Sequence, residues 1–332
     1  MAVDEVQQLR RELVAKWRSR NGRESTSKVA KDVSGFLRKI ILQEKHADVK
    51  ELLISLKNNG KLLATMEPSE LVIVNVVMMF SKLIKDEANK SRKEVSHSLN
   101  GLWSVDSGKQ GKEVSIKNLK RELLSNIKEL TAEIETCRDS VAEHSGDVIS
   151  QQDVLLVQEL ASSHTLQAFL AHARRNTRHR VYSIMKNDEF EAAPEYTTPI
   201  QMKDIGSRMV EISKVVLSCS VVFPDGSCLV PAGGLAIALT AQKHNVPVFV
   251  LTAFYKITPH FIPDPQALNC RKPSNLDFSL SKKFRGKVEV IQPVFDIIPA
   301  QLVTLFISNS GCFIPAHVNK LKEDYYHSQE PF

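Results

Sequence analysis

Residues 214–257 constrain the fold more than any other part of the sequence. Two continuous apolar runs, at 215–222 and 247–251, enclose a Pro-Asp-Gly turn and a stretch rich in alanine and leucine that follows Gly233 and Gly234. Proline and glycine are typical of a tight turn, whereas alanine and leucine favour a helix. Strands without a polar face belong to parallel sheets that helices cover on both sides. The segment therefore predicts a strand, a crossover helix and a second parallel strand, so the chain ends in an α/β domain.

The N-terminal part of the chain predicts helices, because its apolar residues recur at every third or fourth position. We expect an all-helical domain over residues 1–95, a linker loop over 96–111, a long connecting amphipathic helix over 112–146 and a mostly parallel α/β domain over 147–332. The long helix carries an apolar stripe of nearly heptad spacing. That stripe must be buried, either within its own domain or against another subunit, and the spacing alone leaves both open.

The composition excludes several classes of protein. A net charge of +6 with basic and acidic residues interspersed is weak evidence for a polyanionic partner. The five cysteines are scattered and form no Cys/His cluster, so we expect no metal site, and without a signal peptide they indicate reduced thiols in the cytoplasm. The most apolar stretch, residues 71–84, is about 14 residues long and too short to span a membrane. It predicts a buried helix.

Motifs for catalysis are absent: the sequence has no P-loop, GxGxxG, HExxH or GxSxG. Gly233 and Gly234 stand where a helix begins after a strand, a place that can bind an anion, although a tight packing turn is the simpler interpretation. Asp296 lies near the end of an expected strand, where α/β proteins place their active sites, although capping or a structural hydrogen bond explains a single aspartate more often. The basic cluster between Arg174 and Arg180 predicts a solvated helix end more readily than RNA binding.

Several stretches resemble the beta-type members of the family formed by the alpha, beta and delta regulatory subunits of eukaryotic translation initiation factor 2B. The most specific is QPVFDIIPAQLVTLFISNSG at 292–311. Others are ALTAQKHNVPVFV at 238–250, SHTLQAFLAHA at 163–173, FLRKIILQE at 36–44 and EPSELVIVNVV at 67–77. They occur in the family's order and extend over nearly the whole chain.

The resemblance implies an N-terminal helical domain and a Rossmann-like α/β domain, a fold shared with isomerases of phosphorylated ribose derivatives. At the positions of the isomerases' catalytic cysteine and aspartate this chain has Ala161 and Ser220, and Val230 and Pro231 stand where they carry an Asn-Lys pair. A methyl group and a hydroxyl cannot replace a thiol and a carboxylate in acid–base chemistry. We therefore expect no enzyme activity and no cofactor, with sugar-phosphate isomerisation as the alternative.

The resemblance also implies a regulatory role in the guanine-nucleotide exchange factor that acts on initiation factor two. The implied partners are the delta subunit, as a heterodimer, the alpha, gamma and epsilon subunits, and initiation factor two through its alpha subunit, whose phosphorylation is sensed. Membranes and nucleic acid are not implied. The expected subunit interface consists of residues near the C-terminus, together with the helix from Val318: Phe295, Asp296, Pro299, Phe306 and Asn309.

Residues 181–197 depart from the family pattern, because the segment is short and lacks the family's Gln-Gly turn and amphipathic helix. We expect one crossover helix to be missing or reduced to a loop there. For residues 302–307 the sequence leaves two interpretations open, a short helix followed by a strand or a single strand.

Overall fold

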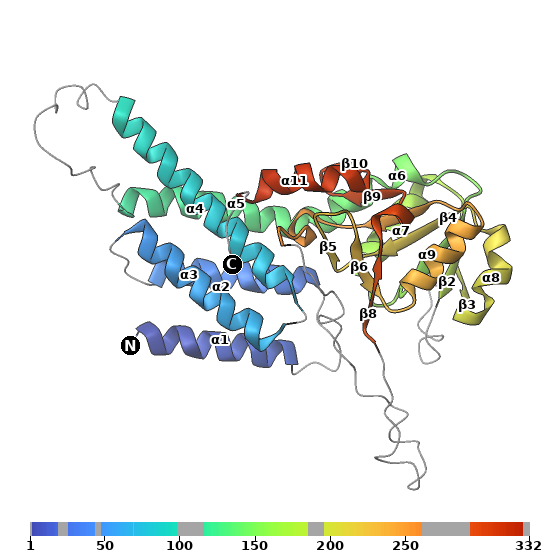
Figure 1. Cartoon of the computed structure of the whole chain (residues 1–332), viewed down its shortest axis with the longest axis horizontal. Helices are drawn as coiled ribbons and strands as arrows, with labels where there is room; N and C mark the ends of the chain where they lie inside the picture. Colours follow the sequence, from blue (N-terminus) through green and yellow to red (C-terminus); the bar gives the residue numbers. More distant parts are fainter. Residues whose placement is uncertain are drawn as a thin grey trace, which may run out of the picture. The chain divides into compact units, whose positions relative to one another are not determined.

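A computed structural model describes residues 2–18, 26–43, 48–68, 70–97, 116–184, 196–260 and 293–327 (Figure 1). The chain divides into two compact units. One comprises residues 1–136 and 323–332, and the other comprises residues 137–322. The division falls within helix α5 (Ile116–Glu143), and the helix at the C-terminal end, α11 (Val318–Tyr325), is also divided between the units.

The first unit is helical, as the sequence predicts. It contains α1 (Ala2–Arg18), α2 (Thr26–Gln43), α3 (Val49–Met66), α4 (Val72–His97) and most of α5. Asp48 begins α3, because its side chain accepts a hydrogen bond from the backbone N–H of Glu51 at 2.7 Å. Apolar side chains spaced by three and four, such as Leu37 and Phe80, are fully buried and form the core.

The apolar run at 71–84 forms the first half of α4 and is largely buried, as predicted. Among the described residues, no helix is both long and apolar enough to span a membrane. The apolar stripe of α5 is buried at Leu123, Ile127, Ile134 and Val141. The chain therefore covers this stripe itself, which agrees with the first of the two alternatives for the long helix.

The second unit is built on a mostly parallel sheet, which confirms the predicted fold class. Within the described residues seven strands pair in the order β10-β9-β7-β4-β1-β2-β3, and β10 alone runs antiparallel to its neighbour. The strands are β1 (Val154–Gln158), β2 (Arg180–Ile184), β3 (Thr197–Ile200), β4 (Lys214–Ser218), β7 (Val248–Leu251), β9 (Leu305–Ser308) and β10 (Gly311–Phe313).

Helices of the second unit follow the expected strand–helix–strand order. Among the described residues, α7 (His164–Asn176) follows β1, α8 (Ile205–Arg208) lies between β3 and β4, and α9 (Gly234–Lys243) precedes β7, whereas the short α6 (Ser145–Val148) precedes β1. α9 connects β4 and β7, which pair in parallel, and its Ile237 and Ala241 share one core with Leu217 and Val250 of those strands. A short 3-10 helix (Ala300–Leu302) precedes β9. Of the two interpretations of residues 302–307, the short helix followed by a strand is therefore confirmed.

The apolar run at 215–222 is not the single strand that the sequence predicts. β4 ends at Ser218, and the backbone N–H of Ser220 donates to the carbonyl of Leu229 at 2.8 Å, which turns the chain into a second sheet. This sheet is antiparallel and has the order β5-β6-β8, with β5 (Val221–Val222), β6 (Cys228–Pro231) and β8 (Phe295–Ile298). Burial alone cannot reveal such a turn, since both strands are buried.

Two predictions lie mostly outside the described residues. The shortened segment at 181–197 includes residues 185–195, and the expected linker loop at 96–111 includes residues 98–111, and neither of these two stretches is described. β2 and β3, on either side of the first segment, pair in parallel with Val181 opposite Thr197.

Candidate functional site

The carboxyl edge of the parallel sheet is where sheets of this class bind ligands, at the point where the strand order reverses. That point lies between β1 and β4, because β2 and β3 continue on one side and β7 and β9 on the other. Gln158 ends β1 and Ser218 ends β4. The residues beside these two strand ends therefore define the first candidate site.

Asp296 and the glycine pair, which the sequence analysis treats as separate candidates, form one cluster here. A carboxylate oxygen of Asp296 accepts hydrogen bonds from the backbone N–H groups of Gly233, at 2.7 Å, and Leu235, at 3.3 Å. Gly233 has φ +100°, a conformation that favours glycine. The chain's own carboxylate thus occupies the N-terminus of α9, where an anionic ligand would bind.

Gln158 fills the space beside this cluster. Its side chain is 5% exposed, and its Nε2 donates to the carbonyl oxygen of Ala232 at 2.7 Å. A Cβ atom added at Gly234 would lie 3.4 Å from Oε1 of Gln158, and one added at Gly233 would clash with the end of Met202. The end of β1 and the start of α9 are therefore packed against each other.

Lys256, in the segment that follows β7, lies at the same edge of the sheet. Its side chain is 8% exposed, and Nζ donates to the carbonyl oxygen of Cys219 at 2.8 Å. Burial raises the pKa of the Cys219 thiol, despite the opposing charge of Lys256, and burial raises the pKa of Cys228 still further. Neither cysteine is a thiolate at neutral pH, and the thiolate is the nucleophile in cysteine chemistry.

The positions that correspond to the isomerases' catalytic groups carry no replacement. Ser220 donates its backbone N–H to Leu229, and Pro231 pairs with Phe295 in the small sheet. Ala161 has only a methyl group. None of these three positions therefore supplies a thiol or a carboxylate.

The predicted interface residues differ in their exposure. Phe306 is fully buried and stacks on Phe313 with ring centroids 5.5 Å apart, and Phe295 is 5% exposed. Phe306 is therefore a core residue of this chain and not a surface residue, because it packs in the hydrophobic core of the second unit. Oδ1 of Asn309 accepts the backbone N–H of Phe254 at 3.2 Å. Pro299 is half-buried.

The chain also exposes an apolar side chain that sequence reasoning did not single out. Ile314 precedes α11 and is 45% exposed. It follows β10, the strand at that edge of the sheet. Phe313, the residue before Ile314, ends β10 and stacks on Phe306.

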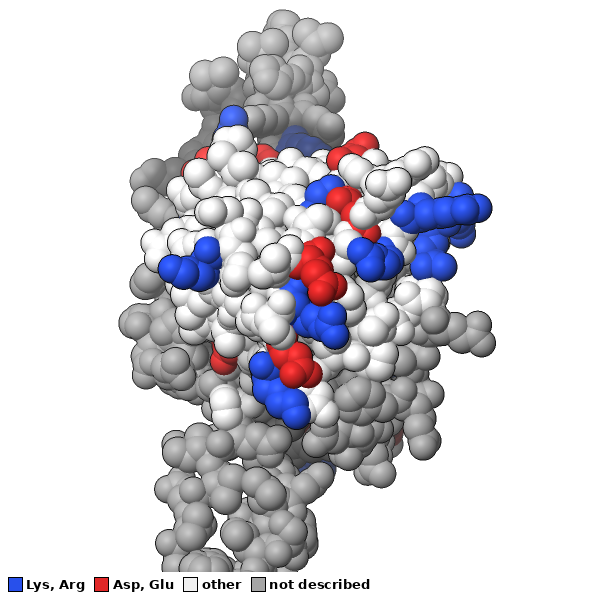
Figure 2. All heavy atoms as spheres, turned by 90° about the vertical axis from the view of Figure 1, so that its right-hand side faces the viewer, with Lys and Arg blue, Asp and Glu red and all other residues white. Residues whose placement is uncertain are grey.

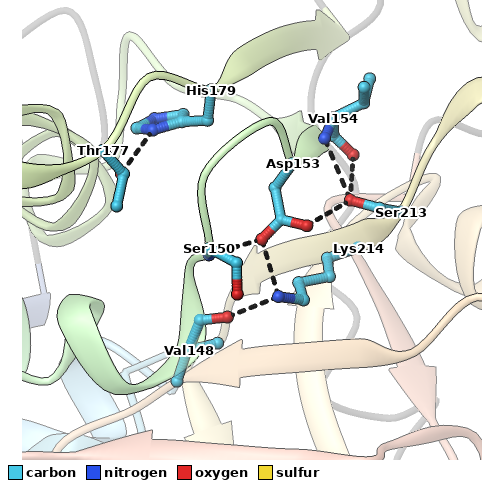
Figure 3. Close-up of polar contacts among 8 residues, drawn as sticks. All are labelled: Val148, Ser150, Asp153, Val154, Thr177, His179, Ser213 and Lys214. Carbon is cyan, nitrogen blue, oxygen red and sulfur yellow. Dashed lines mark hydrogen bonds and ion pairs between the residues drawn. The ribbon is translucent and has the colours of Figure 1, made fainter.

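The amino edge of the sheet carries a polar network around Asp153 (Figure 3). Its carboxylate accepts hydrogen bonds from Nζ of Lys214 at 2.7 Å, the hydroxyl of Ser213 at 2.9 Å and the backbone N–H of Ser150 at 2.6 Å. Lys214 also donates to the carbonyl of Val148 at 2.7 Å. Burial by itself raises the pKa of Asp153, but these donors stabilise the carboxylate more strongly, so the pKa is lowered.

A groove of about 510 Å³ lies beside β3, the strand at the other edge of the sheet. Tyr182 and Thr198 line it from the strands, and Lys203, Asp204 and Arg208 from the helical turns that follow. On the face that Figure 2 shows, several basic side chains lie directly beside acidic ones. The lining of the groove is likewise mixed in charge, with Lys203 and Arg208 beside Asp204.

Sequence reasoning missed Gln158, Lys256 and the network of Asp153. Gln158 and Lys256 are polar residues at the end of apolar runs, VLLVQ and FYK, and this was the available signal. The network joins residues about 60 positions apart, such as Asp153 and Lys214, and no local pattern predicts such a pair.

Comparisons with known proteins identify the family. The model of the initiation factor 2 subunit family matches residues 23–185 and 196–315. The chain therefore belongs to this family, as the sequence motifs predict. The match is interrupted at 186–195, inside the segment that departs from the family pattern.

Two of the relatives found are named as beta subunits of translation initiation factor eIF2B. The translation initiation factor eIF2B subunit beta of Dictyostelium discoideum is 27% identical over 64% of this chain, which spans 57% of that protein's length. The subunit beta of Schizosaccharomyces pombe is 21% identical over 91% of this chain and 92% of that protein.

Solved structures share the fold. eIF2B beta from Chaetomium thermophilum matches with a TM-score of 0.74 at 23% identity, covering 98% of this chain and 93% of that chain. A chain of the tetrameric eIF2B-beta2-delta2 complex from C. thermophilum matches with a TM-score of 0.72 at 22% identity, covering 98% of this chain and 96% of that chain.

Proposed function

We propose that this protein is a non-catalytic regulatory subunit of the guanine-nucleotide exchange factor that acts on translation initiation factor two. It would pair with a delta-type subunit and act in the cytoplasm with the alpha, gamma and epsilon subunits. Through this assembly it would sense the phosphorylation of the alpha subunit of initiation factor two. Family membership and the similarity to beta subunits support the assembly.

The observation that carries the non-catalytic role is the position of Asp296. The N-terminus of a helix such as α9, which follows β6, is where a phosphorylated substrate would bind, because its free backbone N–H groups attract an anion. Here a carboxylate of the chain takes the hydrogen bonds of Gly233 and Leu235, and it would repel a phosphate. With Ala161 and Ser220 in place of a thiol and a carboxylate, nothing specific favours the isomerase alternative.

We place the contact with the delta-type subunit on the surface that Phe295, Pro299, Asn309 and Ile314 build with α11. The exposed side chain of Ile314 offers apolar area, and Phe313, which precedes it in the chain, is anchored in the core by its stack on Phe306. A rigid apolar centre inside a polar rim is typical of binding hot spots. The tetrameric beta2-delta2 complex of C. thermophilum is the fold precedent for such a pairing.

The test is co-purification of the full chain from cytosol, followed by native mass spectrometry. We expect recovery with delta, alpha, gamma and epsilon subunits. Ile314→Arg should abolish recovery of the delta-type subunit, since a buried charge at a hot spot costs about 2 kcal/mol or more. Ile54→Arg is the matched control, because Ile54 is 60% exposed on α3 and the substitution should leave recovery unchanged.

A lone monomer or homodimer would contradict the proposal. If Ile314→Arg recovers the delta-type subunit as well as Ile54→Arg does, the proposed assembly is supported, but the proposed position of the contact around Ile314 is wrong. Turnover of a ribose phosphate by the purified chain would contradict the non-catalytic role.

A further inference from the structure

We propose that four arginines at the amino edge of the sheet form a docking surface for an acidic segment of a partner protein. The arginines, which we call the arginine cluster, are Arg174, Arg175, Arg178 and Arg180. All four side chains are exposed, and no acidic residue lies within 174–180. This inference does not depend on the pairing proposed above.

The arginine cluster is not neutralised by the described part of the chain. No ion pair joins any of the four guanidinium groups to a described carboxylate. Asp153 lies near the cluster, but Lys214, Ser213 and Ser150 already use its carboxylate. By contrast, Arg208 is paired with Glu211 at 3.2 Å. Four like charges in seven positions repel one another, so an anionic partner would relieve that repulsion.

The backbone that carries the arginine cluster is held in place. The backbone N–H of Gln152 donates to the carbonyl of Arg178 at 2.9 Å, and that of Arg180 donates to the carbonyl of Asp153 at 2.9 Å. His179 between them is buried, with Nδ1 hydrogen-bonded to Thr177 at 3.1 Å (Figure 3). Alternate residues of an extended chain point to the same side, so Arg178 and Arg180 project together, away from His179.

Arg174 is positioned by an aromatic ring. Its guanidinium lies 4.3 Å from the ring centroid of Tyr196, just before β3. Burial lowers the pKa of His179 and the charge of Arg174 lowers it further, which is consistent with a positive potential around it. The cluster is therefore a set of guanidinium groups on a fixed backbone, and this reduces the conformational entropy lost on binding.

The chemistry of the cluster favours carboxylates or phosphate groups on a protein over RNA. Guanidinium groups bind both oxygens of a carboxylate or phosphate in a fork. RNA binding without sequence preference uses exposed aromatic rings for base stacking, and the ring beside the cluster, that of Tyr196, is already covered by Arg174. The cluster is also confined to one seven-residue segment, which suits a short acidic stretch.

The experiment measures binding of fluorescein-labelled decaglutamate to the full chain by anisotropy at about 50 to 200 mM salt. We expect Arg175→Gln together with Arg178→Gln to weaken binding about tenfold, because two charge-assisted contacts are lost. The matched control is Arg38→Gln together with Lys39→Gln, which removes the same charge from exposed positions of α2. Tyr196→Ala should weaken binding two- to threefold. Tyr196→Phe should bind as tightly as the wild type, since the ring and not the hydroxyl holds Arg174.

Four outcomes would overturn the proposal. An equal loss in the α2 control would mean that net charge alone attracts the peptide. Tighter binding of a 20-residue uridine oligonucleotide than of decaglutamate would make the surface a nucleic-acid site. Absence of peptide binding would remove the surface altogether. Binding that appears only after Asp188, Glu189, Glu191 and Glu195 are replaced by amides would mean that the chain's own acids neutralise the cluster.

Discussion

Asp153 links the loop before β1 to the start of β4 through a single carboxylate. Asp153→Asn keeps the shape of the side chain but removes the charge, and it leaves the 19%-exposed ammonium of Lys214 without a carboxylate partner. We expect a loss of about 2 kcal/mol in the free energy of unfolding at pH 7, below the cost for a fully buried pair. Urea denaturation followed by circular dichroism measures this loss.

The effect of pH on this pair has a defined sign. The pKa of Asp153 is lower in the folded chain than in the unfolded chain, so the carboxylate stabilises the fold above the unfolded value of about 4. That contribution is lost as the pH falls through the folded pKa, and the wild type and Asp153→Asn should then converge. Asp139→Asn is the control, because its carboxylate is 67% exposed beside Arg138 and should contribute little at any pH. A constant difference between wild type and Asp153→Asn down to pH 2 would contradict this account.

Substitutions at Phe306 and Ile314 distinguish a residue that stabilises the fold from one that binds a partner. Its ring is fully buried against Phe313, so Phe306→Ala should lower the free energy of unfolding by about 3–5 kcal/mol. Ile314→Ala, at a 45%-exposed site, should cost less than 1 kcal/mol and act on partner binding instead. Thermal unfolding of both variants distinguishes these roles, and a stable Phe306→Ala chain would show that the ring is not a core residue.

Helices α3 and α4 approach closely at Gly60 and Val77. A Cβ atom on Gly60 would lie 2.6 Å from one methyl group of Val77 and 2.9 Å from the other, closer than atoms normally pack. Gly60→Ala should destabilise the helical unit by about 1–2 kcal/mol, although alanine is the better helix former by about 1 kcal/mol. Chemical denaturation of the variant checks this value.

The double variant Gly60→Ala/Val77→Ala tests whether the clash with Val77 causes the loss of stability. Val77→Ala removes the methyl groups that Gly60→Ala would meet, so the two changes together should cost less than the sum of their separate effects. Additive effects would show that the helices separate freely and that the close approach is not a constraint.

Local pattern predicted the helices and strands themselves, but not where one sheet ends and another begins. The run at 215–222 is apolar throughout, yet Ser220 already pairs with Leu229 of the small sheet. Both sheets bury their strands, so hydrophobicity is the same on either side of the bend. Only the pairing partners distinguish β4 from β5.

At the scale of the molecule, Lys82 of α4 connects that helix to the C-terminal end of α11 by hydrogen bonds. Its Nζ donates to the carbonyls of Glu323 at 2.9 Å and Asp324 at 2.7 Å, groups that the helix itself leaves unpaired. Lys82→Met should raise the hydrogen-exchange rates of the amides at 325–327 about five- to thirtyfold, which corresponds to a loss of about 1–2 kcal/mol. Lys39→Met on α2 should leave those rates unchanged, and unaltered exchange in Lys82→Met would mean that the end of α11 is held by other contacts.

The sequence by itself determined the class of fold, the helical N-terminal part, the crossover between β4 and β7, and the family. These features depend on periodicity and on short motifs, which are local properties of the chain. The tertiary structure alone decided that Asp296 binds the N–H of Gly233, 63 positions away, and that Phe306 is part of the core. A hydrogen bond between distant residues depends on how the strands are ordered and where each ends, and no local pattern contains that information.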